Sequence, residues 1–122
     1  MVMVPFTMGK LHLPEQSAHG DTMVNHKKVQ MYFTHKNGKR VLDFNFPEFN
    51  KGKGIKGNIE LEALNKDSMV IATPWKEDKL AFYYNQKINC LAAGGEFVIG
   101  SEKYSFTPDK ALGVLDWGRG VW

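Results

Sequence analysis

The sequence has a single cysteine among its 122 residues, no long apolar run and no block of five or more like charges. The lone thiol, Cys90, excludes an internal disulfide framework and a zinc site built on cysteines. Without a stretch of about 18 consecutive apolar residues, no helix is expected to span a membrane. The start of the chain carries no basic region ahead of its apolar residues and no small-residue cleavage site, so a cytoplasmic location is expected.

The chain is, in contrast, rich in aromatic residues, at 12%, and in glycine, with twelve. Its length allows one domain, which we place over residues 1–122. It opens on apolar residues and stops at Trp122 directly after a Gly-rich run. We interpret this as a partial domain of a longer protein, with residues 1–9 and 118–122 extended or exchanged with another copy.

Alternating apolar and polar residues predict about eight short strands separated by turns, which is typical of an antiparallel barrel or sandwich. Asn37-Gly38 between two alternating segments is a strong hairpin signal, because both residues tolerate positive φ. We expect a loop over most of 14–28, a Lys/Gly loop over 50–58 and a break at Gly94-Gly95. The expected strands are 11–13, 29–34, 41–46, 59–63, 68–73, 80–84 with 87–91, 96–99, 103–106 and 111–115.

Positive charge is concentrated in one third of the chain. Residues 27–56 hold eight basic and two acidic side chains and so carry +6, while the remainder carries −3. Such a segment either attracts anions such as nucleic acid or supplies solvated hairpin turns. We favour the turns, so that nucleic acid is not the favoured partner.

The motifs for cofactors and metals are weak. Gly52–Gly57 matches G-x-G-x-x-G, but Pro47 precedes it and a period-two pattern follows, where a nucleotide site needs a strand and then a helix. The four histidines lack metal-ligand spacing. Cys90 is expected to be a small core residue, and Ser17-Ala-His-Gly-Asp21 a turn rather than a triad. No cofactor and no metal is predicted.

The most unusual stretch is Leu115-Asp-Trp-Gly-Arg-Gly-Val-Trp122. Its glycines let large rings approach the backbone, and Asp116 and Arg119 are expected to form a charge-assisted pair. Two interpretations remain open. The stretch either lines a pocket, with Asp116 and Arg119 as candidate catalytic residues, or forms a strand-crossing corner that locks the sheet.

The segment Ala111–Trp122 resembles the signature of a bacterial family called domain of unknown function 2804. Four weaker segments resemble the family in the same order: Val4–Phe6, Ile71–Trp75, Lys87–Leu91 and Gly100–Phe106. Members of that family are longer, so the resemblance implies an internal piece. It also implies an all-β, lipocalin-like (calycin-type) fold, through a distant likeness to carotenoid hydratases and tocopherol cyclases. It implies no reaction.

Three functions therefore compete. The first is binding of an apolar, lipid-like or isoprenoid-like ligand in a β cavity lined by aromatic residues. The second is acid–base catalysis on an apolar substrate, with Asp116 as the acid. The third is nucleic-acid binding through the basic segment. Unpaired strand edges predict in addition a homo-oligomer. The candidate ligand-binding residues are Phe33, Phe44, Phe82, Trp117 and Trp122.

Overall fold

The computed structural model describes residues 14–64, 67–75 and 80–121. The expected strand over 11–13 lies outside these residues. The described chain is almost entirely antiparallel β structure, which confirms the all-β prediction. One short turn of helix, α1 (Phe49–Gly52), interrupts it. The strands are β1 (Thr22–His26), β2 (Val29–Lys36), β3 (Lys39–Phe46), β4 (Ile55–Ala63), β5 (Met69–Trp75), β6 (Ala81–Ile99), β7 (Glu102–Phe106) and β8 (Leu112–Val121).

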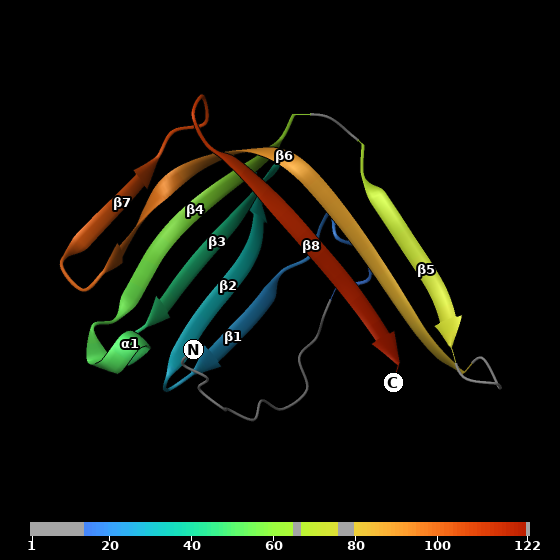
Figure 1. The fold of residues 1–122 in the computed structure, drawn as a ribbon, viewed down its shortest axis with the longest axis horizontal. Coiled ribbons are helices and arrows are strands. Elements are labelled where there is room, and N and C mark those ends of the chain that lie inside the picture. Colours follow the sequence, from blue (N-terminus) through green and yellow to red (C-terminus); the bar gives the residue numbers. More distant parts are fainter. Residues whose placement is uncertain (1–13, 65–66, 76–79, 122) are drawn as a thin grey trace.

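The eight strands form one curled sheet, a half-barrel, in the order β1-β2-β3-β4-β6-β5, with β7 and β8 on the other side of β6. The C-terminal half of β6 pairs with β4 and β7, and its N-terminal half pairs with β5 and β8. Figure 1 shows the resulting shape, in which two walls diverge from the bend in β6. One wall holds β1–β4 and β7, and the other holds β5 and β8.

The bend coincides with a β-bulge in β6. The register with β8 shifts between Ile88 and Leu91, and Cys90 sits between them at a φ of 57°. A bulge adds an unpaired residue to one strand and increases its local twist. The prediction that Cys90 is a core residue is therefore wrong. Its side chain is exposed, because the bulge turns it out of the ladder.

Several boundaries differ from those expected. The predicted break at Gly94-Gly95 is wrong, because β6 runs through it for 19 residues. Gly95 serves a close approach instead: at its φ of 119° an added Cβ would lie 2.2 Å from the Asn58 carbonyl oxygen. The expected loops also contain structure, since β1 forms within 14–28 and β4 begins at Ile55. The Asn37-Gly38 hairpin is confirmed, with φ of 52° and 77°.

The tightest packing lies at the bend. Leu91 is fully buried, and it lies beside Ala92 and Ala93 where β4, β6 and β8 meet. Gly113 of β8 crosses closely over β4, because an added Cβ would lie 2.6 Å from a methyl carbon of Leu61. The two walls are therefore held together at this point by side-chain packing as well as by the ladder.

Away from the bend the apolar residues are only partly covered. Strand pairing places Phe33, Leu42, Ile59 and Leu61 on the same face of β2–β4 as Phe44. We call this the inner face, because Leu61 on it contacts β8. Phe33 keeps 39% of its surface exposed, so the hollow between the walls is open. Among the described residues no helix is long and apolar enough to cross a membrane.

Replacing the residue at the bend is expected to destabilise the whole fold. Leu91→Ala leaves a cavity in a site with no room to relax, so the free energy of unfolding falls by about 2–5 kcal/mol. Chemical denaturation followed by circular dichroism measures the change. Leu112→Ala is the matched control, since Leu112 on β8 is 64% exposed. Equal losses in the two variants would contradict a core centred on the bend.

Candidate functional site

The C-terminal motif lies within β8, where alternate side chains point to opposite faces. Trp117 and Arg119 share a face with Gly113, which packs on Leu61, and so they point into the hollow. The Tyr84 and Trp117 rings meet edge to face there, with centroids 5.8 Å apart. The Arg119 guanidinium carbon lies 5.9 Å from the centre of the Trp117 ring. The motif therefore presents an aromatic surface with a cation to the inner face.

Gly118 and Gly120, which alternate with Trp117 and Arg119, lie on the outer side of β8 and have no side chain. An added Cβ at Gly118 would lie 3.0 Å from Asn85 Nδ2, and one at Gly120 would lie 2.5 Å from the Phe82 carbonyl oxygen. A side chain at Gly120 would collide with the backbone of β6, and one at Gly118 would crowd Asn85. The glycines are thus required by close packing of β8 on β6.

A pocket of about 250 Å³ lies between β8 and the inner face at the open side of the half-barrel. Phe33, Leu115 and Trp117 give it apolar walls, and His35, Arg40 and Arg119 bring nitrogen atoms to it. Residues 14–20, which precede β1, cover one side. Its remaining lining residues are Pro14, Gln16, Ser17, Gly20, Thr22, Asp116 and Gly118.

Ser17 connects the two walls across this pocket. Its hydroxyl donates a hydrogen bond to Gln86 Oε1 on β6, and its carbonyl oxygen accepts one of 3.2 Å from Arg40 Nη2 on β3. A second hollow of about 390 Å³ adjoins the pocket and shares Gln16, Ser17, Trp117 and Arg119 with it. The segment before β1 thus divides one larger opening into two parts.

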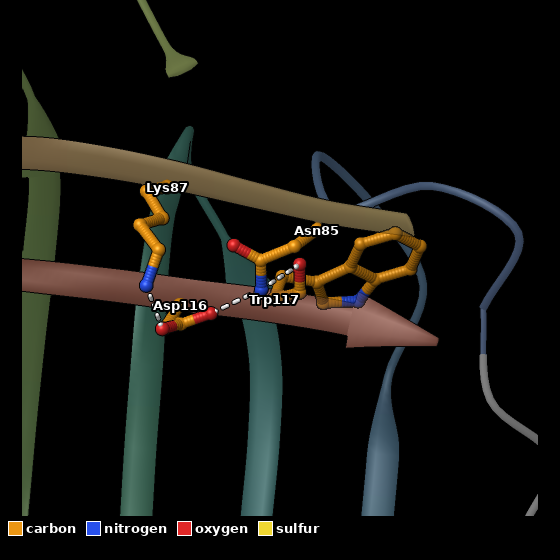
Figure 2. A network of polar contacts seen from close by, with 4 residues as sticks. All are labelled: Asn85, Lys87, Asp116 and Trp117. Atoms are coloured by element: carbon orange, nitrogen blue, oxygen red, sulfur yellow. Dashed lines mark hydrogen bonds and ion pairs between the residues drawn. The ribbon is translucent and has the colours of Figure 1, made fainter. Parts of the chain in front are cut away.

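Asp116 is held on the outer side of β8 by two neighbours on β6. Lys87 Nζ lies 2.5 Å from Asp116 Oδ2, and Asn85 Nδ2 donates to Asp116 Oδ1. Figure 2 shows the carboxylate between these two side chains, with Asn85 also reaching the Trp117 carbonyl oxygen. The hydrogen bond from Lys87, and to a smaller extent the one from Asn85, lowers the pKa of Asp116. The hydrogen bond to Asp116 in turn raises the pKa of Lys87. Asp116 is therefore a carboxylate at neutral pH.

The expected pair between Asp116 and Arg119 is wrong. Residues three apart on a strand point to opposite faces, so Asp116 bonds outward to Lys87 while Arg119 points inward to Trp117. The two candidate catalytic residues both border the pocket, but they approach it from different sides of β8.

The structure brings together only some of the predicted ligand-binding residues. Phe33 and Trp117 line the same pocket. Phe44 shares the inner face but is not among the residues that line this pocket. Phe82 lies at a separate hollow beside Pro74, and Trp122 is outside the described residues.

Sequence reasoning missed His35 and Arg40 as pocket residues. The signal was present, because Arg40 continues the period-two row of Leu42 and Phe44, and His35 continues the row of Phe33. The excess of positive charge in residues 27–56 hides this signal at Arg40. The residues before β1 carried no signal, since their role depends on contacts with distant strands.

The remaining motifs show no catalytic arrangement in the part of the chain that the structure describes. Ser17 bonds to Gln86, while Asp21 Oδ1 accepts a hydrogen bond from the backbone of His35. In Gly52–Gly57, Gly52 ends α1 and the residues from Ile55 onward already belong to β4. Within the described ranges, no three His, Cys, Asp or Glu side chains gather as a metal site would require.

Breaking the outward contact is expected to cost stability with a defined pH dependence. The lowered pKa of Asp116 means that its contribution is present at neutral pH and is lost as the pH falls through the folded-state value. Asp116→Asn should therefore lower the Tm at pH 7, and the difference from the unmodified chain should shrink in acid. Thermal unfolding across pH measures both. Asp109→Asn, in the exposed turn after β7, is the control. A difference that stays constant down to acid would refute the contact's role.

Comparison with known proteins gives one result. No curated protein and no solved structure matches this chain. The sequence model of one family, described as a domain of unknown function, matches residues 1–122 in full. With the corner of β8 and its pocket now described, the match agrees with the resemblance carried by Ala111–Trp122: the chain belongs to the DUF2804 family.

Proposed function

We propose that the half-barrel binds an apolar small molecule in the pocket between β8 and the inner face, in the manner of a lipocalin-like protein. The observation that carries this proposal is the meeting of Phe33, Leu115 and Trp117 at one hollow from strands far apart in sequence. Binding sites for small molecules are concave, mostly apolar and supplied with a few polar groups. The pocket has this composition.

The size of the opening supports the same proposal. The pocket of about 250 Å³ and its neighbour of about 390 Å³ share lining residues, including Trp117. Together they fall within the range of about 300–1,000 Å³ that holds small ligands. The exposed ring of Phe33 would be covered by such a ligand, which gives a favourable free energy of binding.

Catalysis by Asp116 as a general acid has weaker support. A general acid must hold a proton at the working pH, whereas Lys87 and Asn85 lower the pKa of Asp116. Its side chain is also 53% exposed and turned to the outer side of β8. These features favour a structural role for the carboxylate.

Nucleic-acid binding through the basic segment is also less well supported. Lys28 and Lys36 lie at opposite ends of β2. Lys39 forms ion pairs with Glu60 at 3.2 Å and Glu62 at 3.8 Å. Arg40 faces the pocket. The basic side chains are therefore divided between the two ends of the sheet and the pocket, whereas a nucleic-acid backbone would need one continuous basic surface.

Removing the exposed ring in the pocket tests the proposal. Phe33→Ala should weaken binding of an uncharged apolar dye such as Nile red by about 10-fold or more, because a buried phenyl contributes about 1.5–3 kcal/mol. Fluorescence titration measures the affinity. Phe82→Ala is the matched control, since both rings are 39% exposed and Phe82 lies at a different hollow. Equal losses in the two variants, or no saturable binding by the unmodified chain, would sink the proposal.

We further propose that two copies pair through β5. This strand is at the end of the sheet order, and Met69, Val70 and Ile71 are 51%, 49% and 43% exposed. Apolar edge strands with a free ladder pair readily with another chain.

A charge on that edge should prevent the pairing. Ile71→Lys is expected to convert a dimer to a monomer in light scattering, because two lysines would face each other across the new ladder. Leu112→Lys, on the exposed side of β8, should leave the dimer intact. A monomer in the unmodified chain at high concentration contradicts the proposal, and dissociation only by Leu112→Lys places the contact at β8 instead.

A further inference from the structure

The pocket contains more positive charge than its apolar walls explain. Three of its lining residues are of basic type: His35, Arg40 and Arg119. Its one carboxylate, Asp116, is already bound by Lys87 and Asn85. Among the described residues, neither Arg40 nor Arg119 forms an ion pair with a carboxylate. The pocket thus holds two guanidinium groups without an anionic partner.

Arg40 is the more constrained of the two. Its Nη2 donates to the Ser17 carbonyl oxygen, while its Nε is buried and has no hydrogen-bond partner among the described residues. Burial lowers the pKa of the Arg40 guanidinium from its ordinary value, as expected for a charged group partly removed from water. A buried donor on a charged group is costly unless something accepts from it.

His35 lies directly across the ladder from Arg40. Its Nδ1 donates a hydrogen bond of 2.9 Å to the Gly20 carbonyl oxygen, since a carbonyl oxygen only accepts. Its Nε2 is buried, with no partner in the part of the chain that the structure describes. Two adjacent side chains at the pocket therefore each leave one nitrogen unsatisfied.

Arg119 completes the set from the opposite wall. Its guanidinium lies over the Trp117 ring, and it borders both hollows. Glu15 borders the second hollow but not the first. The smaller pocket is consequently the place where an added negative charge meets two cations and no free carboxylate.

We propose that the ligand is an amphiphile with an anionic head group held by Arg40 and Arg119, and with an apolar tail against Phe33, Leu115 and Trp117. This inference rests on the proposed function, because it assigns the head-group chemistry of the ligand in the same pocket. A carboxylate is the simplest such head group, since its two oxygen atoms match the donors of a guanidinium.

Two probes that differ only in the head group test the inference. Laurate and 1-dodecanol have tails of equal length, and each is used to displace Nile red from the unmodified chain. Laurate should displace the dye at a concentration at least about 10-fold lower than 1-dodecanol does, because charge-assisted hydrogen bonds form only with the anion. In Arg40→Met and in Arg119→Met this preference should disappear, while 1-dodecanol binds as before. Lys56→Met, on the opposite face of β4, is the control that should keep the preference.

The outcomes separate the two proposals. If neither compound displaces the dye, the proposed function fails together with this inference. If both displace it equally well from the unmodified chain, the apolar pocket stands and the anionic head group is wrong. Preference for laurate that survives in both arginine variants also overturns the inference. If Arg40→Met loses binding of 1-dodecanol as well, Arg119→Met decides: loss of the preference there supports the proposal, and its retention refutes it.

Discussion

The bulge in β6 is the constraint on which the rest of the structure depends. This strand of 19 residues pairs with β4 and β7 along its C-terminal half and with β5 and β8 along its N-terminal half. Without the bend at Cys90 these partners would continue one another in a flat sheet. With it, β8 turns back over the inner face, and the fully buried Leu91 fills the angle between the walls. The pocket exists because that angle is fixed.

The alternation of β8 then assigns different tasks to adjacent residues of one motif. On the outer side Asp116 anchors the strand to β6 through Lys87, and Gly118 lets the strands approach closely. On the inner side Trp117 and Arg119 are left free to face the hollow. Two interpretations of the motif, a locking corner and a pocket wall, thus describe its two faces, because a strand presents successive side chains to opposite sides.

Local signals in the sequence predicted the parts of the fold that local chemistry determines. The Asn37-Gly38 turn requires two residues that tolerate positive φ, and such residues are visible in a sequence. The bulge at Cys90 gave no such signal, because its position depends on which strands pair on either side of β6. For the site, aromatic content and strand alternation indicate Phe33, and the C-terminal motif indicates Trp117. The period-two alternation of β3 also places Arg40 on the inner face, but Arg40 lies beside a basic turn, where the charge of the segment hides that pattern.

The open hollow and the guanidinium of Arg40 both leave interactions at the pocket unmade in the free chain. The exposed ring of Phe33 forgoes the stabilisation that burial would give, and a half-buried cation with an unsatisfied donor lowers the stability of the free chain. A structure retains such costs where something offsets them, as at binding sites that are complete only when occupied. Any molecule that binds the folded chain and not the unfolded one raises its stability in proportion to the logarithm of its concentration. Phe33 and Arg40, which carry these costs, both lie on the wall of β1–β4, and Trp117 and Arg119 face them from β8. One occupant that contacts both walls would therefore also hold the half-barrel at a fixed opening.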